Sequence, residues 1–326
     1  MNIGWIFVIH PNNGGEMFWN KIKNGLILVG GIVVIYAIFK LLQPARFGSL
    51  SSLYILLQQT MISVVMAYGT YFLLSMGEFD MTLGANAILS AMVGCRLSIS
   101  FGFSGLIIGA LITGVCLGLL NGVMISKIKA PSMIISVGLV VIYESLGVIA
   151  AGGGSMLRIE SQFRALGTPP WSLLISLVVA GIVFFLDSYT LFGVYVKAIG
   201  SSELIAGSMG INIGRTKILA FIISGVCAAL MGVINLCYNT TVSAASNLSS
   251  AIAVFQPMMA CMIGLSFRKY IHPVLAILLG SFFLSLLQNG LLTNGLQSSV
   301  QNIFVGVALL VIIKLTSSTK RYDVIK

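Results

Sequence analysis

The feature that most constrains this chain is a near-continuous series of apolar runs, each about as long as a bilayer is thick. A helix needs about 20 apolar residues to cross the hydrocarbon core. Short polar or glycine-containing stretches bound the runs, which cover residues 25–42, 52–75, 83–101, 103–125, 131–151, 171–187, 216–238, 248–266, 272–293 and 298–315. Little more than Gly102 separates the third run from the fourth. The pattern predicts an all-α polytopic membrane protein with about ten transmembrane helices.

The composition agrees with this prediction. Of 326 residues, 58% are hydrophobic and only 8% are charged, and no soluble globular class has such a composition. Ten spans use about 200 residues, so the remaining loops are short and leave no room for a soluble domain. We therefore predict a single transmembrane domain over residues 1–326.

The net charge of +10 fits membrane orientation better than nucleic-acid binding, because the basic residues are dispersed among loops. The orientation can be tested by assuming that the N-terminus lies inside the cell. Of the 18 Lys and Arg residues, those in outside loops are then Lys40, Arg46, Arg96, Arg158 and Arg164, and the other 13 lie in inside loops. This is a positive-inside bias. It predicts that both termini and the 189–213 loop are cytoplasmic.

A weak internal repeat indicates two inverted halves. The fourth run ends in GLLNGVMI and the ninth contains SLLQNGLL, so Asn121 and Asn289 lie 168 residues apart, each followed by glycine. Five spans separate the two copies, and an odd number inverts the second copy. Inverted repeats are typical of transporters, whereas a chance Asn-Gly pair is the alternative. We expect five-helix repeats over about 25–151 and 171–315.

The segment 189–213 is the longest interruption in the apolar series and contains signals for a short helix. Ser201 and Ser202 can cap its start, and Glu203 favours the positive end of its dipole. Gly210 can close the helix in the left-handed conformation.

Three apolar residues of this short helix, Leu204, Ile205 and Met209, have little core of their own to enter. A short helix with exposed apolar side chains is suited to a groove in another protein. An amphipathic connector at the bilayer surface would have the same features, so both interpretations stay open at this point.

The fourth run carries Gly114, Gly118 and Gly122 at four-residue spacing. Glycines at this spacing form one face of a helix and let another helix approach closely. The pattern predicts helix packing and says nothing about a substrate.

The second and third runs are joined by the short segment GEFDMTLG, which places Glu78, Phe79 and Asp80 between long apolar stretches. The break is too short for a soluble loop, so we expect a discontinuous helix that presents polar groups to a cavity. Glu78, Phe79 and Asp80 are therefore candidates for a translocation route. The alternative is a tight cytoplasmic turn with solvated acids.

Glu144 lies inside the fifth run, where an acid should face the bundle interior or water, so it is a further candidate for the translocation route. A structural hydrogen bond to a neighbouring helix is the competing interpretation. Arg158 and Arg164 follow a flexible Ala-Gly-Gly-Gly stretch on the outside. They are candidates for docking an acidic partner, or only a solvated surface.

Motifs for catalysis or metal binding are missing from the sequence. The two histidines, His10 and His272, are far apart in the chain, and the five cysteines form no CxxC pair. There is no HExxH, GxSxG or GxxxxGK[ST] motif. The chain is therefore predicted to be neither an enzyme nor a metal protein, and any ATP must be bound by another subunit.

Three segments, in order, resemble the permease subunits of bacterial ABC importers of the ribose, xylose and autoinducer-2 class. This class belongs to the branched-chain amino acid and monosaccharide permease superfamily. GEFDMTLGANAILSA is similar to its GGIDLSVG segment, and LNGVMISKIKAPSMIISVGL is similar to its NG…K.PPFIATLG segment. The strongest similarity lies in TLFGVYVKAIGSSELIAGSMGINIGRTKILAFIISG, and the resemblance covers about residues 50–315.

The resemblance implies a type II ABC importer-like permease in the bacterial cytoplasmic membrane. Such a subunit pairs with a second copy or a paralogue beside two cytoplasmic ATPase subunits, which carry ATP and Mg. An extracytoplasmic binding protein delivers a small polar solute, which we expect to be a monosaccharide. The 201–210 helix would be the coupling helix seated on the ATPase, and Arg158 and Arg164 would dock the binding protein.

The chain departs from this family at three places. The glycines of the loop after the eighth span are largely lost from 263–272, Glu144 stands where the family often has Arg, and 247–252 lacks an acid. These departures bear on the sugar and on homodimer versus heterodimer pairing. The alternatives are a nucleoside permease of the same fold, an ion-coupled secondary transporter and a non-transporting membrane scaffold.

Overall fold

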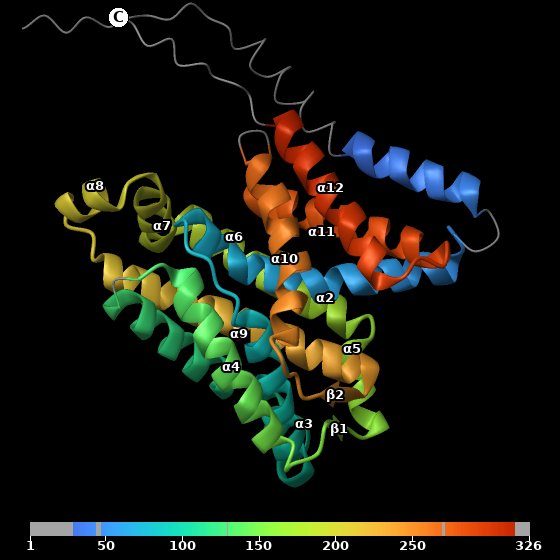
Figure 1. Cartoon of the computed structure of the whole chain (residues 1–326), viewed down its shortest axis with the longest axis horizontal. Coiled ribbons are helices and arrows are strands. Elements are labelled where there is room, and N and C mark those ends of the chain that lie inside the picture. Colours follow the sequence, from blue (N-terminus) through green and yellow to red (C-terminus); the bar gives the residue numbers. More distant parts are fainter. Residues whose placement is uncertain (1–28, 44–46, 129, 269–270, 317–326) are drawn as a thin grey trace, which may run out of the picture.

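The computed structural model describes residues 29–43, 47–128, 130–268 and 271–316, which form a bundle of helices with one small sheet (Figure 1). Its long helices are Val29–Leu42, α2 (Leu50–Ser75), α3 (Leu83–Lys127), α4 (Ser132–Ala150), α6 (Trp171–Tyr189), α9 (Ile213–Asn239), α10 (Ser249–Ser266), α11 (Pro273–Thr293) and α12 (Ser298–Thr316). The short elements are β1 (Met156–Arg158), η1 (Ser161–Phe163), α5 (Arg164–Gly167), α7 (Leu191–Ser201), α8 (Glu203–Ser208) and β2 (Thr241–Ser243).

Within the described residues, seven helices are long and apolar enough to cross a membrane: α2, α3, α4, α6, α9, α10 and α11. The prediction of a helical, polytopic membrane protein is therefore confirmed. The first predicted span begins outside the described residues, and its described part is the helix Val29–Leu42. α12 coincides with the tenth predicted run.

Helix α3 is two helices joined at Gly102. A straight helix of 45 residues would be about 68 Å long, more than twice the thickness of a bilayer core. Gly102 has φ 59° and ψ −140°, a conformation that glycine adopts without steric cost. The two halves then pack against each other, because a Cβ atom on Gly94 would lie 2.6 Å from the carbonyl oxygen of Leu106. This hairpin separates the third and fourth predicted runs.

Helices α2 and α9 pack against each other in the middle of the bundle (Figure 1). A Cβ atom on Gly69 of α2 would lie 2.6 Å from the Cβ atom of Cys227 on α9. On another side of α2, the Tyr68 hydroxyl donates to the carbonyl oxygen of Val274 on α11, at 3.2 Å.

The second half of α3 packs against α9 through its glycines. A Cβ atom on Gly114 would lie 2.6 Å from the Cβ atom of Ala229, and one on Gly122 would lie 2.8 Å from Cα of Ile218. Gly118 is in the same position relative to α9, since its Cβ atom would lie 2.5 Å from a backbone carbonyl oxygen. The glycine face that stands out in the sequence therefore faces α9.

A two-stranded antiparallel sheet closes the end of the bundle remote from α8 (Figure 1). Strand β1 follows α4 and pairs with β2, which follows α9, so that Leu157 lies opposite Val242. The sheet ties together the loops that leave two different helices. At the same end, the Gln58 side chain of α2 donates to the carbonyl oxygen of Gly167 in α5.

Candidate functional site

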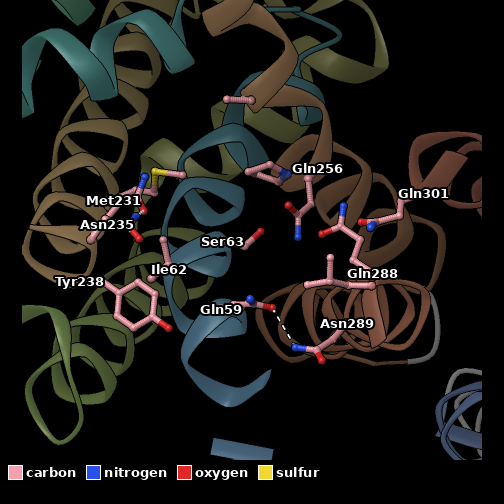
Figure 2. Close-up of a pocket in the computed structure, with 14 residues that line it drawn as sticks. Gln59, Ile62, Ser63, Met231, Asn235, Tyr238, Gln256, Gln288, Asn289 and Gln301 are labelled. Atoms are coloured by element: carbon pink, nitrogen blue, oxygen red, sulfur yellow. Dashed lines mark hydrogen bonds between the residues drawn. The ribbon is translucent and has the colours of Figure 1, made fainter. Parts of the chain in front are cut away.

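A polar cavity of about 400 Å³ lies between α2, α9, α10, α11 and α12. Its lining residues are Gln59, Ile62, Ser63, Met231, Asn235, Tyr238, Asn239, Ala253, Gln256, Pro257, Gln288, Asn289, Leu292 and Gln301. Figure 2 shows Asn235 and Tyr238 on one side of the cavity, with Gln256, Gln288 and Gln301 on the other. The volume falls within the range of small-molecule sites, roughly 300–1,000 Å³.

Carboxamides dominate the polar lining of this cavity. They are Gln59, Asn235, Asn239, Gln256, Gln288, Asn289 and Gln301. No Asp, Glu, Lys, Arg or His is among the lining residues that the structure describes. Each carboxamide offers both hydrogen-bond donors and an acceptor without carrying a charge. The cavity is thus polar but neutral.

Several of these groups have unused hydrogen-bonding capacity. Gln256 and Gln288 make no side-chain hydrogen bond to any described residue, and the buried hydroxyl of Ser63 has no partner there either. Asn289 donates to Oε1 of Gln59 at 3.3 Å, a contact drawn in Figure 2. Buried polar groups are normally satisfied, so free groups around a cavity indicate a place for a hydrogen-bonding ligand or water.

Two further cavities adjoin this one. A cavity of about 330 Å³ shares Ala253, Gln256 and Gln288 with it. A cavity of about 210 Å³ shares Met231 and Asn235 and extends along α3 to strand β2. Open space therefore continues in two directions from the carboxamide cavity, with a mostly apolar lining in both.

The residues of this cavity do not stand out as a group in the sequence. Its carboxamides are scattered over five apolar helices, and folding alone brings them together. One signal was present: Gln59 with Ser63, and Asn235 with Asn239, are polar pairs spaced four residues apart, which places each pair on one helix face. Asn289 was noted only as part of the repeat.

Asp80 is buried in a hydrogen-bond network at the start of α3. Its Oδ1 atom accepts from the backbone N–H and the hydroxyl of Thr82, at 2.8 and 2.7 Å, and Oδ2 accepts from Asn121 at 3.3 Å. The hydroxyl of Tyr143 on α4 donates to Asn121 at 2.6 Å. The network joins both halves of α3 to α4. Neither Asp80 nor Phe79 lines any of the cavities described here.

Glu78 lies beside α8 in an ion-pair cluster. Lys217, near the start of α9, contacts Glu78 at 2.6 Å and Glu203 at 3.0 Å. Lys217 and Glu78 are mostly buried, whereas Glu203 is exposed. All three line a cavity of about 530 Å³ between the end of α3, the start of α4 and α9. The cluster links α8 to the turn between α2 and α3.

Glu144 is 6% exposed and contacts the start of α10. Its Oε2 atom accepts from the backbone N–H of Leu248 at 3.0 Å. Its Oε1 atom accepts from the backbone N–H and the hydroxyl of Ser250, at 3.0 and 2.7 Å. Glu144 lines none of the cavities described here. These contacts correspond to the interpretation of Glu144 as a hydrogen-bonding partner of a neighbouring helix.

The predicted short helix is present as α8. Ser202 is its N-cap and accepts from the backbone N–H of Ile205 at 3.4 Å, and Gly210 has φ 81°. Ser201 does not cap it, because α7 continues through Ser201, whose hydroxyl bonds back to Lys197. The large apolar residues of α8 and of its C-cap point away from the bundle, since Leu204 is 88%, Ile205 62% and Met209 72% exposed.

The helices that lead to α8 are fixed by a buried acid. Asp187, in the last turn of α6, contacts Lys197 of α7 at 2.8 Å and accepts from the Tyr71 hydroxyl of α2 at 2.8 Å. His272, which caps α11, lies nearby against Ser188. Burial lowers the pKa of His272 below its ordinary value, so the imidazole is neutral at pH 7.

Arg158 and Arg164 are both exposed at the opposite end of the bundle from α8, in β1 and at the start of α5. Arg158 lies opposite Thr241 in the sheet. The small sheet thus presents one of these two basic side chains on its surface.

The family model described as "Branched-chain amino acid transport system / permease component" matches residues 52–313. The chain belongs to this family. The prediction of a permease subunit from the ribose, xylose and autoinducer-2 class of ABC permeases is confirmed, and the chain is a transport subunit.

Three relatives illustrate the range of the family. The D-allose transport system permease protein AlsC of Escherichia coli is 26% identical over 89% of each chain. The autoinducer 2 import system permease protein LsrC of Photorhabdus laumondii is 24% identical over 87% of each chain. The L-arabinose ABC transporter permease protein AraH of Azospirillum brasilense is 27% identical over 69% of this chain and 68% of its own. No solved structure matches the chain.

Proposed function

We propose that this chain is the permease subunit of an ATP-driven importer for an uncharged polyhydroxylated solute, which we take to be a monosaccharide. The observation that carries the proposal is the neutral cavity lined by carboxamides between α2, α9, α10, α11 and α12. A sugar hydroxyl both donates and accepts hydrogen bonds, and a carboxamide can satisfy both roles. The relatives named for D-allose and L-arabinose transport support a sugar.

The same lining disfavours other solutes of this family's range. An amino acid carries an ammonium and a carboxylate, and burying these charges without partners is costly. Among its described lining residues, the cavity has no charged side chain to pair with them. A nucleoside would be held best by stacking on aromatic rings, whereas Tyr238 is the one aromatic residue in the described lining.

The architecture we propose is ten spans in two inverted five-helix repeats. The packing supports it, since the second half of α3 lies against α9 and α11 lies against α2. In the proposed repeats, α2 corresponds to α9, and the second half of α3 corresponds to α11. Exchanging the two halves would therefore turn the α3–α9 contact into the α11–α2 contact, and the reverse. The positive-inside bias supports a cytoplasmic location for both termini and for α8. The subunit would sit in the bacterial cytoplasmic membrane beside a second permease copy or a paralogue.

Helix α8 is the proposed contact with the cytoplasmic ATPase, which binds ATP and Mg. Its three exposed apolar side chains, held on a capped helix, suit a groove on a partner. ATP-driven closure of two ATPase subunits would move α8 and bias the bundle between outward-facing and inward-facing states. Arg158 and Arg164 would contact the binding protein at the opposite face.

The test replaces carboxamides of the cavity in the complete importer, reconstituted in liposomes with its ATPase and binding protein. Gln256→Leu and Gln288→Leu remove free hydrogen-bonding groups, and Gln297→Leu is the matched control because Gln297 is exposed outside the cavity lining. The probes are radiolabelled D-ribose, D-xylose, L-arabinose and D-allose, with radiolabelled leucine as the amino acid for comparison. The readout is sugar transported per ATP hydrolysed.

We expect the wild type to transport at least one of these sugars. Each cavity variant should lower the transport ratio about tenfold, as the loss of a hydrogen bond to a buried polar group does. The Gln297→Leu control should keep the wild-type ratio. Transport of leucine in place of every sugar, or an unchanged ratio in both cavity variants, would contradict the proposal.

A further inference from the structure

Helix α10 contributes Ala253, Gln256 and Pro257 to the carboxamide cavity. These residues lie in its second and third turns, so the position of the helix start determines where the Gln256 amide is placed. The side chain of Gln256 makes no hydrogen bond to a described residue. Its placement therefore depends on how α10 is held.

The start of α10 has an unusual backbone. The N-cap Leu248 has no side-chain oxygen for the free N–H groups of the first turn, and both Asn247 and Leu248 have positive φ, at 56° and 61°. This left-handed conformation is sterically unfavourable for a residue with a Cβ atom, and more so for Leu than for Asn. Such strain persists only where the surrounding structure fixes it.

Two neighbouring helices enclose this strained turn. From α4, the carboxyl of Glu144 receives three hydrogen bonds from Leu248 and Ser250. From α3, Gly84 lies so close to Ser250 that a Cβ atom on it would overlap the Ser250 carbonyl group. Glu144 thus replaces the missing cap from a different helix.

We infer that Glu144 is a positioning residue for transport, which fixes the first turn of α10 and through it the Gln256 amide. This inference rests on the proposed function of the cavity. Glu144 does not touch the solute, because it lines none of the described cavities. Its role is to hold a strained helix start in the one register that leaves Gln256 facing the carboxamides of α11 and α12 (Figure 2).

The test measures sugar transported per ATP hydrolysed, with the reconstituted importer and the sugar of the panel that the wild type transports. Glu144→Ala removes the acceptors, and Glu144→Ala combined with Ser250→Asp returns a carboxylate to the same helix start. Ser145→Ala is the control, because the neighbouring Ser145 is exposed and bonds only within α4. A loss of folded protein lowers transport and ATP hydrolysis together and leaves the ratio unchanged.

We expect Glu144→Ala to lower the ratio about tenfold, a size typical of losing hydrogen bonds to a charged group. Ser250→Asp should restore most of the ratio in the double variant, and Ser145→Ala should match the wild type. If Glu144→Ala does not accumulate in the membrane, Glu144→Gln, which keeps one acceptor, makes the same comparison. An unchanged ratio in Glu144→Ala, or in Glu144→Gln where only that variant accumulates, overturns the inference. Absence of sugar transport by the wild type would instead overturn the proposed function.

Discussion

At the residue scale, the buried acids among the described residues connect different parts of the bundle. Glu144 caps α10, and Asp187 joins α6 to α7 and α2. Asp80 joins the start of α3 to Asn121 in its second half, and Asn121 in turn bonds Tyr143 of α4. A carboxyl group in an apolar bundle is costly unless it is hydrogen-bonded. Each of these acids has several partners, which explains how the bundle accommodates them.

Lys217 gives the first prediction at this scale. It neutralises the largely buried Glu78, so Lys217→Met should leave that charge without a close partner. We expect the free energy of unfolding to fall by about 3 kcal/mol, which is typical of removing one partner from a buried ion pair. The measurement compares the thermal midpoints of three purified proteins in detergent: the wild type, Lys217→Met and the double variant Glu78→Gln/Lys217→Met.

The double variant removes both charges and should recover most of the lost stability. Glu203→Gln is the matched single change, because Glu203 is exposed and contacts the same lysine. It should lower the midpoint by much less. Equal losses for Lys217→Met and for the double variant would show that the pairing with Glu78 does not hold this turn in place.

Some of these residues stand out in the sequence, whereas their partners do not. Glu144 stood out because acids are rare inside apolar runs, and Glu78 because it lies in a short break between two runs, but their partners could not be read from the sequence. Leu248 and Ser250 lie more than 100 residues from Glu144, and Lys217 looked like an ordinary loop cation. The partners of a buried charge depend on the tertiary fold, which spacing along the chain does not encode.

At the element scale, local signals predicted much of the structure. The ten apolar runs coincide with helices to within a few residues wherever the structure describes them, since hydrophobic length is a property of each segment alone. Helix α8 was predicted in the same way, from its cap and its closing glycine. The error at Ser201 reflects the ambiguity of two adjacent serines, either of which can cap.

The glycine face of α3 supports a second prediction at this scale. Gly118→Ala would place a methyl group against the backbone of α9, 2.5 Å from a carbonyl oxygen, and should destabilise the protein by about 1–3 kcal/mol. Gly138→Ala is the matched control on α4, where a Cβ atom meets nothing within 4 Å. The control should be neutral or stabilising by up to about 1 kcal/mol.

Thermal midpoints of the two purified variants in detergent make this comparison. A Gly118→Ala midpoint at or above that of Gly138→Ala would show that the α3–α9 contact is looser than described.

At the scale of the whole molecule, the candidate cavity was the part that sequence reasoning missed. Its polar groups come from five helices, and no single helix carries a motif. Carboxamides such as Gln256 and Gln288 are also unremarkable in isolation, because they are neutral and tolerated in many helices. What makes them a candidate site is that their side chains converge on one space without hydrogen-bond partners among the described residues.

We propose that the two ends of the bundle have different roles. The α8 end carries exposed apolar residues and the Lys217 cluster, and the sheet end carries Arg158 and Arg164. The carboxamide cavity lies among the long helices that run between these ends. An importer needs this division, because ATP is hydrolysed on one side of the membrane and the solute arrives on the other.

The most direct test of the importer assignment is co-purification of the solubilised protein from its own cells. The wild type is compared with a Leu204→Asp/Ile205→Asp double variant, and Met156→Asp serves as control because Met156 is an exposed apolar residue at the opposite end. Mass spectrometry identifies the retained proteins. We predict that an ATPase with a GxxxxGK[ST] motif is retained by the wild type and by Met156→Asp, and lost from the double variant. Intact protein without any ATPase, or an ATPase retained equally by all three, would contradict the account.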